Sequence, residues 1–145
     1  MIKATKAPKA KKSPVVSTPP ISHGVGRRKS FVARVWLRKG TGKIVVNGKN
    51  FIEYFDTEIA RLAASTPFRI LPTVAYDVQA NVVGGGFIGQ ADAIKLGISR
   101  ALVEVDEGLR VLLREHDLLT VDSRVKERKK YGQKAARRKF QFVKR

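Results

Sequence analysis

The chemically most suggestive residues of this 145-residue sequence are its lysines and arginines. They number 30, against 12 aspartates and glutamates, so the formal net charge is +18. Eleven of these bases lie in the last 22 residues, interleaved with Tyr131, Phe140 and Phe142. Because cations attract phosphates and aromatic rings pack on bases or sugars, this composition predicts a nucleic-acid-binding tail. Fully extended, at about 3.3 Å per residue, the tail would reach about 70 Å, which favours a large folded RNA.

A second basic cluster stands at residues 26–29, directly before the first predicted strand, where a sheet would present it. Its arginines suit bidentate contacts to phosphate. From the two clusters we take as candidate RNA-binding residues Arg27, Arg28, Lys29, Arg124, Lys126, Arg128, Lys129, Lys130, Tyr131, Lys134, Arg137, Arg138 and Lys139. Lys144 and Arg145, at the very end of the tail, would lie deepest along its path.

The charge is divided sharply along the chain. Residues 1–29 hold eight bases and no acid, residues 30–123 hold eleven of each, and residues 124–145 hold eleven bases and one acid. We therefore predict a disordered or extended basic arm over 1–22, a globular domain over 23–123 and an extended basic RNA-binding tail over 124–145. One charged tail is often kept for solubility, but two basic arms on a neutral body favour binding to a polyanion.

One motif has the spacing of a nucleotide site. Residues 84–89, GGGFIG, match G-x-G-x-x-G between a predicted strand and a predicted helix. However, Gln90 and Ala91 stand where a phosphate-binding loop needs Lys and Ser or Thr, so we interpret the glycines as a tight turn before a helix whose N-terminus could hold an RNA phosphate. Ser99 falls within a predicted helix, and His116 has no nucleophile to activate. We expect no enzyme and no cofactor, and keep an enzyme with a nucleotide site as an alternative.

The sequence contains no cysteine and only two histidines, His23 and His116. This composition excludes a disulfide framework, an iron–sulfur cluster and a zinc site built on cysteine, so we expect no metal site. No apolar run has the length of a membrane-spanning helix, and the first residues lack the apolar stretch of a secretory signal. We therefore expect an intracellular protein without membrane contact.

The hydrophobic pattern predicts the strands that must position the basic residues. Apolar residues alternate over 31–37, a turn follows at 39–42, and a β-branched run occupies 43–46, so we predict a two-stranded hairpin. The clearest alternation, from Val74 to Val82, predicts a third strand with one buried face.

Helices are predicted between and after these strands. A short helix is expected over 51–55, Asp56 or Thr57 would cap a longer one, and Asp106 would cap the last. The predicted apolar faces are Ile59, Leu62 and Ala63 in the first long helix, Ile94, Ile98, Ala101, Leu102 and Val105 in the second, and Leu109, Leu112 and Leu113 in the last. The second of these should be the main core helix.

The chain resembles the bacterial form of the ninth-protein family of the small ribosomal subunit in three segments, GRRKSFVARVWLRKGTGKIVVNGK, VVGGGFIGQADAIKLGISRAL and RVKERKKYGQKAARRKFQFVKR. The resemblance covers about residues 24–145. It implies a single α+β domain like the second domain of ribosomal protein S-five. Its βαβ crossover would be left-handed, an exception to the usual handedness.

The resemblance further implies a structural protein of the small subunit that binds rRNA of the 3′ major domain in the subunit head, beside neighbouring head proteins. In this family the tail runs through RNA to the peptidyl site, where its last Lys and Arg approach the tRNA. Carried over to this chain, those residues are Lys144 and Arg145. The protein would be cytoplasmic, in the small ribosomal subunit, with an organellar ribosome as the lesser alternative.

The chain departs from the family pattern at Val121, Ser123, Phe140 and Val143, so the path of the tail before its end stays open. A second alternative also stays open. The basic AKAPKAKKSP arm and the high charge suggest an architectural DNA-binding protein of the nucleoid.

Overall fold

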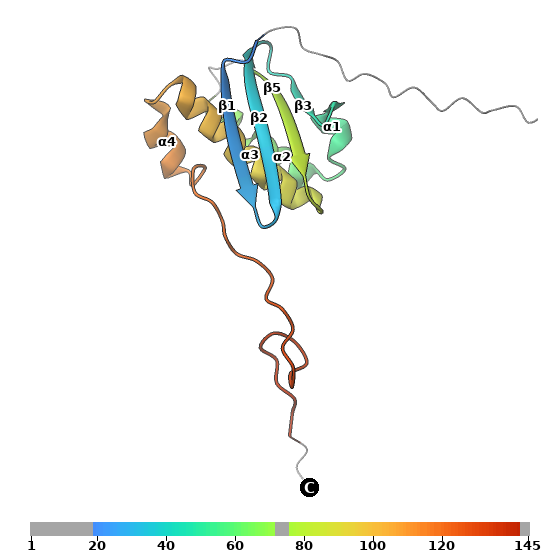
Figure 1. The fold of residues 1–145 in the computed structure, drawn as a ribbon. Coiled ribbons are helices and arrows are strands. Elements are labelled where there is room, and N and C mark those ends of the chain that lie inside the picture. The colour runs from blue at the N-terminus through green and yellow to red at the C-terminus, as the bar shows by residue number, and fades with distance from the viewer. Residues whose placement is uncertain (1–18, 72–75, 143–145) are drawn as a thin grey trace, which may run out of the picture.

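The computed structural model describes residues 19–71 and 76–142, and these form one mixed sheet with helices covering one of its faces (Figure 1). The strands are β1 Ser22–Arg28, β2 Phe31–Lys39, β3 Ile44–Val46, β4 Lys49–Asn50 and β5 Tyr76–Val83. The helices are α1 Phe51–Tyr54, α2 Glu58–Ile70, α3 Phe87–Val105 and α4 Leu109–Glu115. The predicted α+β class is confirmed.

Strand pairing differs from the prediction at one important place. The order across the sheet is β1–β2–β5–β3–β4, so the predicted hairpin between residues 31–37 and 43–46 is wrong. β2 pairs antiparallel with β1 and with β5, whereas β3 pairs parallel with β5. The chain therefore passes from β2 across the end of β5 before it forms β3.

A partly exposed carboxylate near the start of β5 explains this crossing. Oδ1 of Asp77, on β5, accepts hydrogen bonds from the backbone N–H groups of Thr41, Gly42 and Lys43 at 2.9, 3.0 and 2.9 Å. These bonds, above all the one from Lys43, lower the pKa of the Asp77 carboxyl, because they stabilise its ionised form. A side chain 34 residues away in the sequence thus holds the segment that local turn residues would otherwise close into a hairpin.

The sequence pattern does not predict strand β1. Its residues, SHGVGRR, include two glycines and little apolar alternation, yet Ser22, Gly24 and Gly26 face the core and are buried. β1 pairs with β2 along its whole length through a two-residue turn at Lys29 and Ser30. Lys29 has a φ of 54°, in the left-handed region that residues other than glycine rarely adopt.

The main core helix is confirmed. Ile94, Ile98, Ala101 and Leu102 of α3 are fully buried against the sheet, as their helical spacing predicts. The short helix α1 and strand β5 also match the prediction from residue 76 onward, while Val74 lies outside the described residues.

Helix α2 buries a different face from the predicted one. Of the predicted residues, Ile59 and Leu62 are 67% and 48% exposed, and Ala63 packs partly buried against the core. The buried residues are Ala60, Ala64 and Pro67. α2 packs against α3, and small side chains let the two helices approach closely. The prediction is wrong because it ranked residues by hydrophobicity, while this contact selects them by size.

The last helix, α4, has its N-cap two residues after the predicted cap, Asp106. Oδ1 of Asp106 accepts a hydrogen bond from the backbone N–H of Gly108 at 2.9 Å, and Gly108 occupies the N-cap position. Leu113 is fully buried, whereas Leu112 is exposed, so only part of the predicted apolar stripe reaches the core. None of the described helices combines the length and apolar character needed to cross a bilayer.

Strand β1 and helix α3 approach each other so closely that only glycine fits between them. A Cβ atom on Gly24 would lie 2.1 Å from the carbonyl oxygen of Gly97, and one on Gly26 would lie 1.8 Å from that of Ala93. On the helix side, a Cβ on Gly97 would lie 2.7 Å from Cγ2 of Val35. Any larger residue at these positions forces strand and helix apart.

We predict that Gly26→Ala lowers the free energy of unfolding by about 3 kcal/mol, because an added methyl must displace the backbone of α3. Gly85→Ala is the matched control, since its Cβ would have only an ordinary contact, 3.7 Å from Cε1 of Phe31. Urea denaturation of both variants measures the difference. Equal stability of the two would contradict the glycine-mediated contact.

Candidate nucleic-acid interface

The basic cluster at the end of β1 divides into two environments. Arg27 and Lys29 are exposed, Arg27 on the strand and Lys29 in the turn that follows it. Arg28 points the other way, toward the base of the C-terminal tail, and only 15% of its side chain is exposed. The alternation of a strand separates neighbouring residues in this manner.

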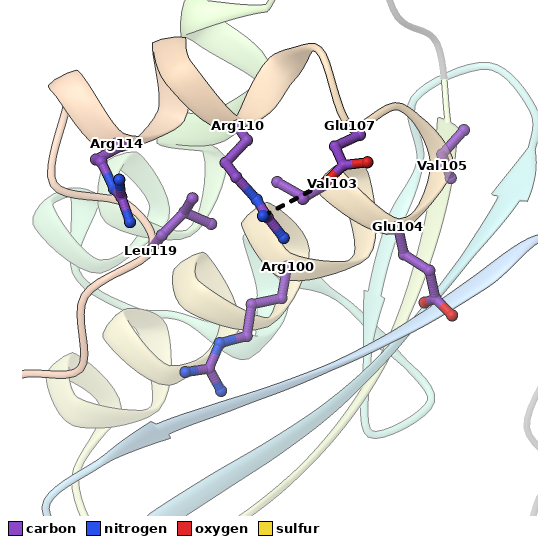
Figure 2. A pocket seen from close by; sticks show the side chains of 8 residues that line it. All are labelled: Arg100, Val103, Glu104, Val105, Glu107, Arg110, Arg114 and Leu119. Carbon is purple, nitrogen blue, oxygen red and sulfur yellow. Dashed lines mark ion pairs between the residues drawn. The ribbon is translucent and has the colours of Figure 1, made fainter.

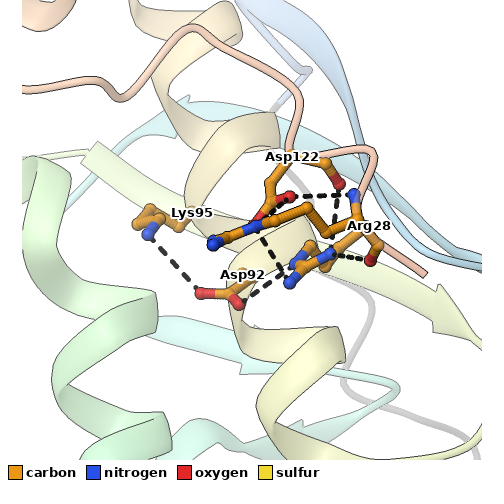
Figure 3. Close-up of polar contacts among 5 residues, drawn as sticks. Arg28, Asp92, Lys95 and Asp122 are labelled. Atoms are coloured by element: carbon orange, nitrogen blue, oxygen red, sulfur yellow. Dashed lines mark hydrogen bonds and ion pairs between the residues drawn. The ribbon is translucent and has the colours of Figure 1, made fainter. Parts of the chain in front are cut away.

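Arg28 joins three parts of the chain (Figure 3). Its Nη1 donates to the backbone carbonyls of Asp122 at 3.1 Å and Arg124 at 2.8 Å. Its Nη2 lies 3.0 Å from Oδ2 of Asp122, and its Nε lies 3.7 Å from Oδ2 of Asp92 on α3. The guanidinium is therefore occupied by the protein, and it fixes the first residues of the tail to β1 and α3.

The anchor cluster consists of Arg28, Asp92, Lys95, Asp122 and Arg124. Lys95 adds an ion pair to Asp92 at 3.5 Å, and the Arg124 side chain donates to both carboxylate oxygens of Asp122. These bonds from Arg124, together with its backbone N–H and the Arg28 charge, hold the pKa of the Asp122 carboxyl well below its ordinary value. Asp122 thus stays ionised and keeps its two arginines in place.

Beyond this anchor the described tail runs away from the domain (Figure 1). Every base between residues 124 and 142 is exposed. The predicted RNA-binding bases in this exposed set are Arg124, Lys126, Arg128, Lys129, Lys130, Lys134, Arg137, Arg138 and Lys139. Lys144 and Arg145 lie outside the described residues.

The sequence predicts an extended tail, but the described part of the tail is not extended throughout. It doubles back through a bridge between Gln133 and Lys139, and the backbone N–H of Lys134 donates to the carbonyl of Arg138 at 2.8 Å. Glu127, the tail's acid, binds the guanidinium of Arg137. Because some residues close this small loop, the tail reaches less far than a fully extended chain would.

The aromatic residues of the tail are available for stacking. Tyr131 and Phe142 are 96% and 97% exposed. The ammonium group of Lys134 lies over the ring of Phe140, 5.7 Å from the ring centroid. Exposed rings beside cations are the arrangement that packs on bases of single-stranded nucleic acid.

The glycine-rich segment 84–89 serves packing. Cβ atoms on Gly84 or Gly89 would lie 2.5 and 2.2 Å from ring atoms of Phe31, so these glycines make room for that ring. Nε2 of the buried Gln90 donates to the carbonyl of Gly84, which closes the turn from inside. This geometry favours the interpretation as a tight strand-to-helix turn.

The residues weighed for catalysis are used structurally. Ser99 is fully buried within α3 and its Oγ donates to the carbonyl of Lys95 at 2.9 Å, while His116 is exposed at the end of α4. In the part of the chain that the structure describes, no three His, Cys, Asp or Glu side chains are placed to hold a metal ion.

Two surfaces of the described residues carry arginines that the predicted clusters do not include. One is a cleft of about 850 Å³ between α3 and α4, lined by Arg100, Arg110 and Arg114, but also by Glu104 and Glu107 (Figure 2). Arg110 pairs with Glu107 at 3.3 Å, and Arg100 donates to the carbonyl of Val25 at 2.7 Å.

The other surface is the sheet face that none of the helices in residues 19–71 and 76–142 covers (Figure 1). It carries Arg27, Arg34, Trp36 and Arg38. The signal was present in the sequence, since Arg34 and Trp36 alternate with the buried Ala33, Val35 and Leu37. The apolar residues of this strand predict its buried face only, so the sequence analysis does not assign Arg34, Trp36 and Arg38 to a site.

Comparison with known proteins gives a consistent result. Residues 26–145 match the family model described as ribosomal protein S9/S16. A small ribosomal subunit protein uS9 from Cytophaga hutchinsonii is 49% identical over 126 residues, covering 86% of this chain and 98% of that protein. Proteins of the same name from Borreliella afzelii and Maridesulfovibrio salexigens are 52% and 48% identical, each covering 86% of this chain and 93% and 96% of their own lengths.

We predict that Asp122→Asn releases the base of the tail, because the uncharged amide no longer holds Arg28 and Arg124. Trypsin should then cleave faster after Arg124 and Lys126, while circular dichroism shows an unchanged domain. Glu115→Gln is the control, since it removes one exposed carboxylate from α4 and leaves the anchor intact. Equal cleavage rates in the two variants would argue against the anchor.

The same anchor has a pH dependence of definite sign. Because the pKa of Asp122 is lowered on folding, its stabilising contribution is present above the ordinary aspartate pKa of about 3.9 and is lost only in stronger acid. The backbone N–H of Arg124, which donates to this carboxylate at 3.0 Å, reports the protonation by its NMR shift. A midpoint at or above the ordinary value would contradict the assigned bonds.

Proposed function

We propose, from the premise that the chain belongs to the ribosomal protein S9/S16 family, that it binds small-subunit rRNA through its basic arms and tRNA through the end of its tail. The family consists of structural proteins of the small ribosomal subunit and not of enzymes. Neither alternative drawn from the sequence, a nucleoid DNA-binding protein or an enzyme with a nucleotide site, fits that membership.

One observation carries the rRNA proposal. Every lysine and arginine in the described tail is exposed, and the first residues of the tail are fixed to the domain. An anchored tail loses less conformational freedom on binding than a free one, so more of its electrostatic attraction appears as affinity. Such contacts go to phosphates and orient the protein, whereas the shape of the folded rRNA supplies specificity.

In this proposal the chain has three working parts. Residues 1–22 form a basic arm, residues 23–123 a domain that positions both arms, and residues 124–145 the RNA-binding tail. Arg27 and Lys29 bind rRNA beside the tail, and Arg28 directs the tail by anchoring it. The crossover from β3 through α1 and α2 to the parallel β5 would be the left-handed unit of the domain that resembles ribosomal protein S-five.

The proposed place is the head of the small subunit, on the 3′ major domain of its rRNA and beside other head proteins. Bacterial relatives of similar length favour a cytoplasmic ribosome. Lys144 and Arg145 would then approach peptidyl-site tRNA, and the described part of the tail, which runs away from the domain up to residue 142, supports this proposal (Figure 1).

We predict opposite effects of Lys29→Gly on stability and on binding. Glycine accepts the positive φ of 54° without strain, so the free energy of unfolding should rise by about 0.5 kcal/mol. Losing one phosphate contact should reduce the slope of log affinity for rRNA against log salt by about 0.7 to 0.9.

The matched control for Lys29→Gly is Arg69→Gln, which removes one exposed charge from α2, on the helical side of the sheet. Urea denaturation and filter binding at several salt concentrations supply the two readouts. A salt slope that Lys29→Gly leaves as steep as the control would remove this residue from the interface.

Removing Lys144 and Arg145 should weaken tRNA binding to the peptidyl site of reconstituted small subunits and leave subunit assembly intact. The physical reason is that only the end of the tail would reach the tRNA. The double variant Lys126→Gln and Arg128→Gln removes the same charge near the base of the tail and should show the reverse pattern. Unchanged tRNA affinity after the truncation would contradict the proposal that Lys144 and Arg145 bind tRNA.

A further inference from the structure

We propose that the uncovered face of the sheet is a third RNA-binding surface, on which Arg27 and Arg34 hold phosphates and Trp36 packs against a base. This inference rests on the proposed binding of small-subunit rRNA and adds a site to it. Neither basic arm includes Arg34 or Trp36.

Strand register places these side chains on one surface. Arg27 pairs with Val32, and Val32 and Arg34 are alternate residues of β2, so the two arginines are diagonal neighbours on the same face. Trp36 follows two residues later and pairs with His23 of β1 on one side and Gln79 of β5 on the other. The three functional side chains therefore form a continuous strip along β2.

One end of the strip is aromatic, because Trp36 lies beyond Arg34 and beside His23 of β1. The rings of His23 and Trp36 have centroids 5.2 Å apart and planes inclined by 44°. Val83 of β5, which pairs with Val32 at the other end of the strip, is 76% exposed. An aromatic pair on the same face as two exposed arginines matches a nucleic acid, which offers a flat ring beside a charged backbone.

The charge of this face is positive. Among the strand residues on it, the acid is Asp77, at the end beside Arg38, and its carboxylate is occupied by three backbone N–H groups. Glu104 lies at the outer edge, where its carboxylate accepts from the backbone N–H of His23 at 3.0 Å. No described acid forms an ion pair with Arg27 or Arg34. A polyanion complements this distribution.

Two further arguments favour RNA over an acidic protein as the occupant. The strip is continuous with Lys29, in the turn that joins β1 to β2, so one RNA segment could lie on the turn and the sheet together. Flat sheets that carry aromatic and basic residues are also a recurrent platform for single-stranded RNA. The cleft between α3 and α4 is a weaker candidate, because Glu104 and Glu107 line it together with its arginines.

The chain contains one tryptophan, so its fluorescence reports this surface directly. Full-length protein is titrated with a transcript of small-subunit rRNA, and Trp36 emission is recorded with and without acrylamide. We expect rRNA to quench the emission by stacking and to shield Trp36 from acrylamide. Binding by filter assay is measured in the same samples.

Variants separate this surface from the tail. The double variant Arg27→Gln and Arg34→Gln should weaken the shielding of Trp36 and lower the log–log salt slope by about 1.5, since each phosphate contact contributes about 0.7 to 0.9. Arg69→Gln, on the helical side, should leave the shielding unchanged. Lys129→Gln with Lys130→Gln should weaken overall binding while Trp36 stays shielded in the bound protein.

The outcomes distinguish the inference from the function on which it rests. If rRNA binds and neither the emission nor the acrylamide quenching of Trp36 changes, the sheet surface is wrong and the arms alone bind. If polyglutamate shields Trp36 as well as rRNA does, the surface fits an acidic protein and the inference is overturned. If full-length protein fails to bind rRNA at all, the proposed function itself fails.

Discussion

Strand β1 reaches helix α3 only because Gly24, Gly26 and Gly97 leave their two backbones in contact. This approach joins the two elements that carry the anchor cluster, since Arg28 ends β1 and Asp92 lies in the second turn of α3. With a wider separation, Arg28 could not bind α3 and the base of the tail together. The direction in which the basic tail leaves the domain thus depends on three missing side chains.

The domain also separates bases that look alike in the sequence. Arg27, Arg28 and Lys29 are consecutive, yet the strand turns Arg28 inward, where Asp92 and Asp122 neutralise it, and leaves its neighbours in solvent. Charge that is paired in this way supports structure, and charge that is unpaired is available to a polyanion. The proposed function uses both kinds of charge, because a tail that is not fixed at its start would lose more conformational entropy on binding RNA.

The spacing of apolar residues correctly predicts those elements that bury one regular apolar face. Two predicted apolar faces are buried, one on β2 and one on α3. They consist of Phe31, Ala33, Val35 and Leu37, and of Ile94, Ile98 and Leu102. The same spacing does not predict β1, where the close contact with α3 requires glycine. It also does not predict the buried face of α2, where the contact with α3 requires small side chains such as alanine. In each case the deciding partner is distant in the sequence.

The sequence by itself determined that the net charge lies in the two terminal segments, that the middle of the chain is neutral, and that the class is α+β, because charge and hydrophobic period are local properties. Tertiary structure alone decided that β3 pairs with β5, since Asp77 binds the segment before it from across the sheet. It also decided that Arg28 is an anchor and that the described helices leave uncovered the face on which Arg34 and Trp36 alternate. Hydrogen bonds and contacts between segments 30 to 100 residues apart leave no periodicity in the chain, so only the folded molecule reveals them.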